Sequence, residues 1–136
     1  VLAWISINNS INLVPIIFYF GAIFWTLGYD TIYGYQDIKD DEIIGLKSTS
    51  IKFKNNPKKF LFISYSLLFI LFLVGGIFMK FNYFYYLLLI LPLTHLFFFQ
   101  MRIFNFKDPS SCLKAFKSNN VFGLIMLLNI LIIKNL

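Results

Sequence analysis

The sequence predicts an all-α integral membrane protein, a bundle of about four to five transmembrane helices. The first reason is composition: of 136 residues, 59% are hydrophobic and 13% are charged, whereas soluble domains average about 45–50% and about 25%. The second reason is that the apolar residues, which raise the mean hydropathy to +0.75, form long uncharged stretches. Because a soluble domain this small cannot bury so much apolar surface, the excess is expected to face lipid.

Three apolar stretches have the length of a membrane span, and they cover residues 11–28, 60–79 and 83–99. A bilayer core requires about 20 residues of helix. Backbone groups in lipid have to be hydrogen-bonded within the segment, which favours helices at these lengths. Residues 1–7 are interpreted as the tail of an earlier span.

The last apolar stretch, residues 121–133, is short. Asn119 and Asn120 precede it, and asparagine is a good N-cap residue. A helix that begins there and continues to the end would span a bilayer only marginally.

Basic residues concentrate in two polar segments, residues 30–59 and 100–120, which are predicted to be long loops. The tight turn at residues 80–82 and the tail carry one lysine each. By the positive-inside rule, both long loops are expected in the cytoplasm. Topology therefore accounts for the net charge of +6, and no nucleic-acid partner is expected.

Acidic residues cluster where the first span ends. Five of the six occur within thirteen positions: Asp30, Asp37, Asp40, Asp41 and Glu42. If the first helix continues through this segment, Asp30, Asp37 and Asp41 share one face, and the last two have Cβ atoms about 5–6 Å apart. Carboxylates at this spacing suit Mg²⁺, which takes one or two of them together with substrate phosphates.

A solvated acidic loop beside a basic one is the alternative interpretation of this segment. Tyr29, Tyr33 and Tyr35 alternate with the acidic residues. Tyrosines at this depth form the ordinary aromatic belt of membrane proteins, or their ring faces stabilise a nearby cation.

Two segments carry a family resemblance. Residues 29–50, YDTIYGYQDIKDDEIIGLKSTS, resemble the second aspartate-rich motif of the UbiA family of membrane prenyltransferases, above all its members that act on 4-hydroxybenzoate. Residues 112–123, CLKAFKSNNVFG, resemble the segment before the last helix of the same group. The order and spacing of the two segments also fit.

The resemblance implies a nine-helix bundle in the bacterial inner membrane, with its active-site loops in the cytoplasm. It implies Mg²⁺-dependent transfer of a polyprenyl group from polyprenyl diphosphate to the ring of 4-hydroxybenzoate, a step of ubiquinone biosynthesis. Residues 1–136 would form the C-terminal part of one such domain. The N-terminal half, with the first aspartate-rich motif, is absent from the sequence, so the chain alone is expected to be inactive and to need that half as its partner.

The resemblance also assigns roles to six residues: Asp37 and Asp41 in metal binding and catalysis, Tyr33 in catalysis at the allylic cation, and Asp30, Asp40 and Lys47 in substrate binding. For Lys47, an ordinary cytoplasmic-side lysine is the alternative. His95 lies inside a span, where a helix–helix hydrogen bond is favoured over a role as proton acceptor. Cys112 has no neighbouring histidine in the sequence, and a catalytic thiol is not expected.

Two other functions stay open. One is a different UbiA-family prenyltransferase of the haem O, menaquinone or tocopherol type. The other is a non-enzymatic cation-binding membrane transporter. Transporters hold their acidic residues near the bilayer midplane, whereas here the acidic residues lie at the end of a span.

Overall fold

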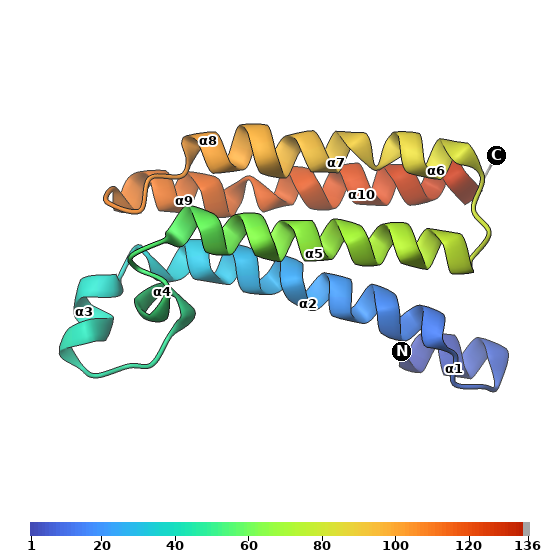
Figure 1. Cartoon of the computed structure of the whole chain (residues 1–136), viewed down its shortest axis with the longest axis horizontal. Coiled ribbons are helices and arrows are strands. Elements are labelled where there is room, and N and C mark those ends of the chain that lie inside the picture. Colours follow the sequence, from blue (N-terminus) through green and yellow to red (C-terminus); the bar gives the residue numbers. More distant parts are fainter. Residues whose placement is uncertain (135–136) are drawn as a thin grey trace.

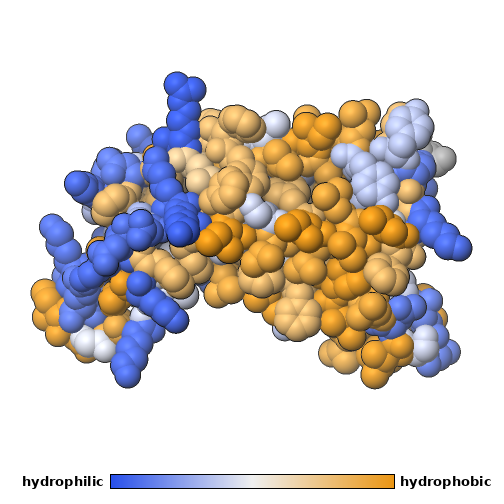
Figure 2. Space-filling view, in the orientation of Figure 1, coloured by the Kyte–Doolittle hydropathy of each residue, from blue (hydrophilic) through white to orange (hydrophobic). Residues whose placement is uncertain are grey.

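The computed structural model describes residues 1–134, and within this range it contains helices and no strands. Four helical stretches of the described chain are long and apolar enough to cross a membrane: Leu13–Gly34, Pro57–Phe78, Tyr83–Ile103 and Pro109–Lys134. They pack side by side as a bundle (Figure 1). On the face shown in Figure 2, apolar side chains form a broad belt and polar ones gather at both ends. The predicted all-α membrane bundle is confirmed.

Helix α2 (Leu13–Gly34) follows the short helix α1 (Leu2–Asn8) and is longer than the apolar stretch that predicts it. The Asn12 side chain caps α2 by accepting a hydrogen bond from the Val14 amide at 3.3 Å. At its other end, α2 runs through Asp30 into the acidic segment. The membrane span therefore leads directly to the candidate site.

Helix α5 (Pro57–Phe78) packs along α2. Pro57 starts the helix, where its fixed φ is favourable and its missing N–H is not needed. At the interface the ring of Tyr65 covers Gly28, and a Cβ on Gly28 would lie 2.3 Å from that ring. Small residues allow membrane helices to approach closely, so Gly28 sets the α2–α5 distance.

The third span is built from four consecutive pieces: α6 (Tyr83–Leu88), α7 (Ile90–Thr94), η1 (His95–Gln100) and α8 (Met101–Ile103). Pro92 lies within α7 and cannot donate a backbone hydrogen bond. The η1 segment is a π-helix. Such wide turns rotate the residues that follow them relative to a regular α-helix.

The fourth span differs from its prediction. Residues 100–120 are mostly helical, because α9 (Pro109–Lys117) lies within them and α10 (Asn119–Lys134) follows almost directly. Asp108 caps α9 by accepting a hydrogen bond from the Ser110 amide at 3.0 Å, and Pro109 occupies the first turn. The prediction of a long second loop was therefore wrong. The prediction that the last span is only marginally long enough was also wrong, because α9 and α10 together form a candidate span of 26 residues. The predicted helix start at Asn119 is confirmed.

A buried polar network holds the third and fourth spans against α5. The Tyr65 hydroxyl donates to Gln100 Oε1 at 2.5 Å. Gln100 Nε2 donates to the Ala115 carbonyl at 2.9 Å and to Ser118 Oγ at 3.1 Å. His95 Nε2 donates to the Ser118 carbonyl at 3.0 Å. The helix–helix hydrogen bond predicted for His95 is confirmed. It joins the network at Ser118, which lies between α9 and α10.

Candidate functional site

A small helical cap lies at one end of the bundle, next to the ends of α2 and α5 (Figure 1). It consists of the turn after Gly34, then α3 (Ile38–Ile43), and then α4 (Thr49–Lys52). The first helix does not continue through the acidic segment, so the expected single face shared by Asp30, Asp37 and Asp41 was wrong. The chain turns at this point, and a Cβ on Gly34 would lie 2.6 Å from Ser50 Oγ. A larger residue at position 34 would therefore force the Ser50 side chain or α4 to move away from the end of α2.

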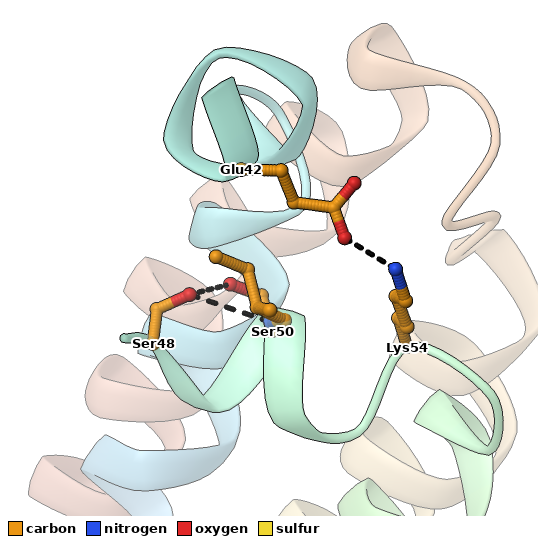
Figure 3. A network of polar contacts seen from close by, with 5 residues as sticks. Glu42, Ser48, Ser50 and Lys54 are labelled. Carbon is orange, nitrogen blue, oxygen red and sulfur yellow. Dashed lines mark hydrogen bonds and ion pairs between the residues drawn. The ribbon is translucent and has the colours of Figure 1, made fainter. Parts of the chain in front are cut away.

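Hydroxyl groups fasten α4 to the bundle. Thr49 Oγ1 lies 2.6 Å from Thr31 Oγ1 on α2, and one of the two donates to the other. Ser48 caps α4 by accepting a hydrogen bond from the Ile51 amide at 3.3 Å, and its Oγ lies 2.8 Å from that of the buried Ser50 (Figure 3). The Ser-Thr-Ser run after Lys47 thus has a structural role that sequence reasoning missed.

An ion pair joins α3 to the segment that follows α4. Lys54 Nζ donates to Glu42 Oε1 (Figure 3). No other ion pair occurs among the described residues. Since both side chains are partly exposed, the pair contributes modestly to stability, and it places one cation beside the acidic residues.

Asp37 and Asp41 lie one helical turn apart. The Asp41 amide donates to the Asp37 carbonyl at 2.9 Å, which closes the first turn of α3. Their i,i+4 spacing therefore survives the break in the longer helix. The Asp37 side chain makes no capping hydrogen bond, so its carboxylate is available to a ligand.

A cavity of about 570 Å³ lies beside α3. Its lining includes Asp37 and Asp40, together with Lys54 and Lys107. Lys107 comes from the segment before α9, so the two polar segments meet at the same end of the bundle. Carboxylates are the ligands that hard metal ions prefer, and ammonium groups attract anions, so this lining has the chemistry for both.

The remaining predicted residues lie outside this cavity. Asp30 is exposed on α2. Tyr33 is 45% exposed, and its ring packs on Phe116 of α9 with centroids 4.8 Å apart. Lys47 lines a separate cavity of about 390 Å³ beside α4. The structure thus brings together Asp37 and Asp40, places Asp41 one turn away, and leaves Asp30, Tyr33 and Lys47 apart.

Tyr35 borders the same cavity and was not singled out as a site residue from the sequence. Its side chain is 1% exposed, packs against Phe104 with centroids 5.6 Å apart, and its hydroxyl has no hydrogen-bond partner. Burial, with a smaller contribution from the Cys112 thiol, raises the pKa of Tyr35 to about 12. The position of Tyr35 between Gly34 and Asp37 was the feature of the sequence that could have indicated its place at this cavity.

The donor set fits Mg²⁺ only as part of a coordination shell. No group of three or more metal-binding side chains occurs within residues 1–134. Asp37 and Asp40 nevertheless present hard oxygen donors to one cavity, and Asp41 lies next to them. Because Mg²⁺ commonly takes one or two carboxylates and completes its shell with water and phosphate oxygens, these residues suffice for one side of such a site.

Aromatic side chains of α2 pack against those of the fourth span near the cap end. Trp25 packs on Phe122 and Tyr29 on Phe116, with ring centroids 4.8 Å and 5.8 Å apart. Trp25 Nε1 also donates to Asn119 Oδ1 at 3.0 Å. These contacts hold α2 against the fourth span.

Comparison with known proteins decides the family. A sequence model of the UbiA prenyltransferase family matches residues 1–130. The chain belongs to the UbiA prenyltransferase family. The predicted relationship is therefore confirmed over nearly the whole length of the described bundle.

Relatives of this UbiA chain carry names that agree with one another. It is 40% identical over 116 residues to "4-hydroxybenzoate polyprenyltransferase, mitochondrial" of Dictyostelium discoideum, covering 85% of this chain and 25% of the relative. It is 40% identical over 136 residues to the Bos taurus protein of the same name, covering 96% and 35%. It is 34% identical over 127 residues to "4-hydroxybenzoate octaprenyltransferase" of Francisella tularensis subsp. novicida, covering 92% and 44%.

The chain spans less than half the length of these relatives. No solved structure matches it. The bundle and its cap therefore correspond to one part of a UbiA protein.

Proposed function

We propose that this chain is the C-terminal part of a Mg²⁺-dependent prenyltransferase that transfers a polyprenyl group from polyprenyl diphosphate to the ring of 4-hydroxybenzoate. One observation carries the proposal. In a UbiA-family chain whose relatives are named for this activity, Asp37 and Asp40 share a cavity with Lys54 and Lys107.

The mixed charge of the cavity suits a diphosphate. Lys54 and Lys107 supply cations for the phosphate oxygens, and Lys54 is held in place by Glu42. Asp37 and Asp41 would hold the metal, and Asp30 and Asp40 would flank it. When bound, Mg²⁺ supplies positive charge that stabilises the departing diphosphate.

The aromatic face next to the cap suits the other half of the reaction. The Tyr33 ring is partly exposed and held by Phe116, so it can present its π face to an allylic cation. In the complete domain, the rest of the bundle would shield that cation from water. Contact of Lys47 with phosphate stays a prediction, because Lys47 lines the neighbouring cavity.

We further propose that the cap faces the cytoplasm of a bacterium and that the bundle lies in the inner membrane. The concentration of lysines and arginine at the cap end supports this orientation. Since the chain covers less than half of its relatives, we assign the rest of the metal site to the N-terminal half of the domain.

The test is an assay of the full-length protein in lipid vesicles with Mg²⁺, polyprenyl diphosphate and isotope-labelled 4-hydroxybenzoate. We expect label in a lipid-soluble product, and no product from residues 1–136 alone. Transfer only to a haem, naphthoate or tocopherol-type acceptor would indicate another branch of the family. Cation flux without transfer would indicate a transporter, and turnover by residues 1–136 alone would show that the site is complete without the rest.

A further inference from the structure

A second cavity, of about 830 Å³, lies at the end of the bundle away from the cap. Four elements enclose it: α2, α5, the turn into α6, and α10. Phe18, Phe72 and Ile130 are among the side chains that make its lining mostly apolar. Lys80 and Lys134 are the charged residues of this lining. In Figure 1 the α5–α6 turn and the end of α10 lie together, opposite α3 and α4.

Within residues 1–134, these two lysines have no acidic side chain as a neighbour. All six acidic residues fall between Asp30 and Glu42 or at Asp108, at the cap end. The one ion pair of the described chain, Glu42 with Lys54, is also at the cap end. Lys80 and Lys134 are exposed and form no ion pair within residues 1–134. They therefore place two positive charges at a membrane boundary, where long lysine side chains extend toward the headgroups.

Lys80 occupies a backbone position that favours glycine. Its φ is +53°, and it ends α5 with two hydrogen bonds: Lys80 N–H to the Ile77 carbonyl and Phe81 N–H to the Gly76 carbonyl, both at 3.1 Å. This is the Schellman arrangement, in which glycine is the usual residue at the left-handed position. A lysine at this position makes the backbone less stable than a glycine would, and its side chain adds a positive charge to the lining of the cavity.

We propose that the cavity binds an acidic phospholipid, with its phosphate between Lys80 and Lys134 and an acyl chain among Phe18, Phe72 and Ile130. The two ammonium groups match the charge of an anionic headgroup, and the apolar side chains beside them match an acyl chain. The Asn82 side chain lines the cavity and makes no capping bond within its own helix, so its amide can donate to a phosphate oxygen. The apolar lining beyond the lysines favours a lipid over free phosphate.

The test uses the full-length protein in detergent and counts bound lipids by native mass spectrometry. Phosphatidylglycerol should be retained in preference to phosphatidylcholine of the same chain length. The double variant Lys80→Gly/Lys134→Gln should bind phosphatidylglycerol about 25-fold more weakly, from about a fivefold loss for each lysine. Because Lys80→Gly relieves the left-handed strain, its melting temperature should not fall, which separates lost binding from misfolding.

Three controls can overturn the proposal. Lys58→Gln/Lys59→Gln makes the same kind of charge change at the cap end and should leave the preference intact; an equal loss would show general charge attraction only. Ile130→Trp fills the cavity with both lysines present and should weaken binding. Unchanged binding would show that the acyl chain does not occupy the cavity. Glycerol phosphate should not compete, and competition would indicate a free-phosphate site. Failure to retain any phosphatidylglycerol would contradict the proposal outright.

Discussion

The Tyr65 hydroxyl donates a 2.5 Å hydrogen bond to Gln100 Oε1, and both side chains are fully buried. This contact links α5 to the π-helical segment η1, and Gln100 carries the link on to Ala115 and Ser118. The His95 ring also donates a hydrogen bond to this region, to the Ser118 carbonyl. Three of the four candidate spans therefore depend on one connected set of hydrogen bonds near the cap.

We expect Gln100→Leu to lower the free energy of unfolding by about 1–2 kcal/mol, because the Tyr65 hydroxyl is left buried without a partner. Tyr65→Phe should cost a similar amount by orphaning Gln100 Oε1. The double variant should be less destabilised than the sum of the two. Detergent-induced unfolding of the full-length protein measures all three. Strict additivity would show that the contact contributes no coupling.

Tyr35→Phe is expected to leave stability at pH 7 unchanged or slightly higher, because the hydroxyl has no hydrogen-bond partner to lose. The pKa of Tyr35 is about 12 in the fold, against an ordinary 10.0. The fold thus favours the protonated phenol, so this contribution is complete below pH 10 and is lost as the pH rises through 12.

The measurement for Tyr35 is the melting temperature between pH 9 and 12. The parent should lose more stability over that interval than Tyr35→Phe does. The comparison cancels the titration of lysines and other tyrosines, which both proteins share. Parallel curves would mean that the Tyr35 hydroxyl is not held in an apolar environment.

Gly34→Ala should loosen the cap, since its Cβ would lie 2.6 Å from Ser50 Oγ and would push α4 off α2. Faster trypsin cleavage after Lys52 and Lys54 would report this opening. Gly123→Ala is the matched control, because a Cβ there meets nothing within 4 Å. Equal cleavage of Gly34→Ala and the parent would contradict the close approach.

Cysteine labelling tests the proposed orientation. Cys112 is buried, so it should not compete with an introduced thiol. Asn55→Cys in the cap should react only with reagents that reach the cytoplasm, and Tyr83→Cys at the opposite end should react from outside the cell. Labelling of position 55 from outside the cell would show that the cap faces away from the cytoplasm, which would contradict the proposed orientation.

Composition and uncharged stretches were enough to predict the bundle, because lipid imposes helix on any apolar stretch of this length. The α9 helix escaped prediction because its sequence is polar on one side. Lys114 and Lys117 are exposed, while Cys112 and Ala115 are buried against the bundle. Counting apolar residues in a row cannot detect such a helix, whereas the Asp108-Pro109 start was a usable signal.

The candidate site was predictable in its residue types and not in its shape. The i,i+4 spacing of Asp37 and Asp41 is local, and it holds in α3. The turn after Gly34 depends on α4 packing against α2, which is a contact between segments that no local pattern contains. For the same reason, the approach of Lys107 to Asp37 could be learned only from the fold.

The most direct test of the proposed function is the rate of prenyl transfer by full-length Asp37→Asn and Asp41→Asn at limiting Mg²⁺. Each removes a carboxylate charge while keeping the side-chain shape, and we expect rates lower by about 10²–10³, partly restored by excess Mg²⁺. Asp108→Asn is the control: it removes the same charge but still caps α9, so its rate should stay close to that of the parent. Near-parental rates for both Asp37→Asn and Asp41→Asn would contradict the assignment of metal and diphosphate to α3.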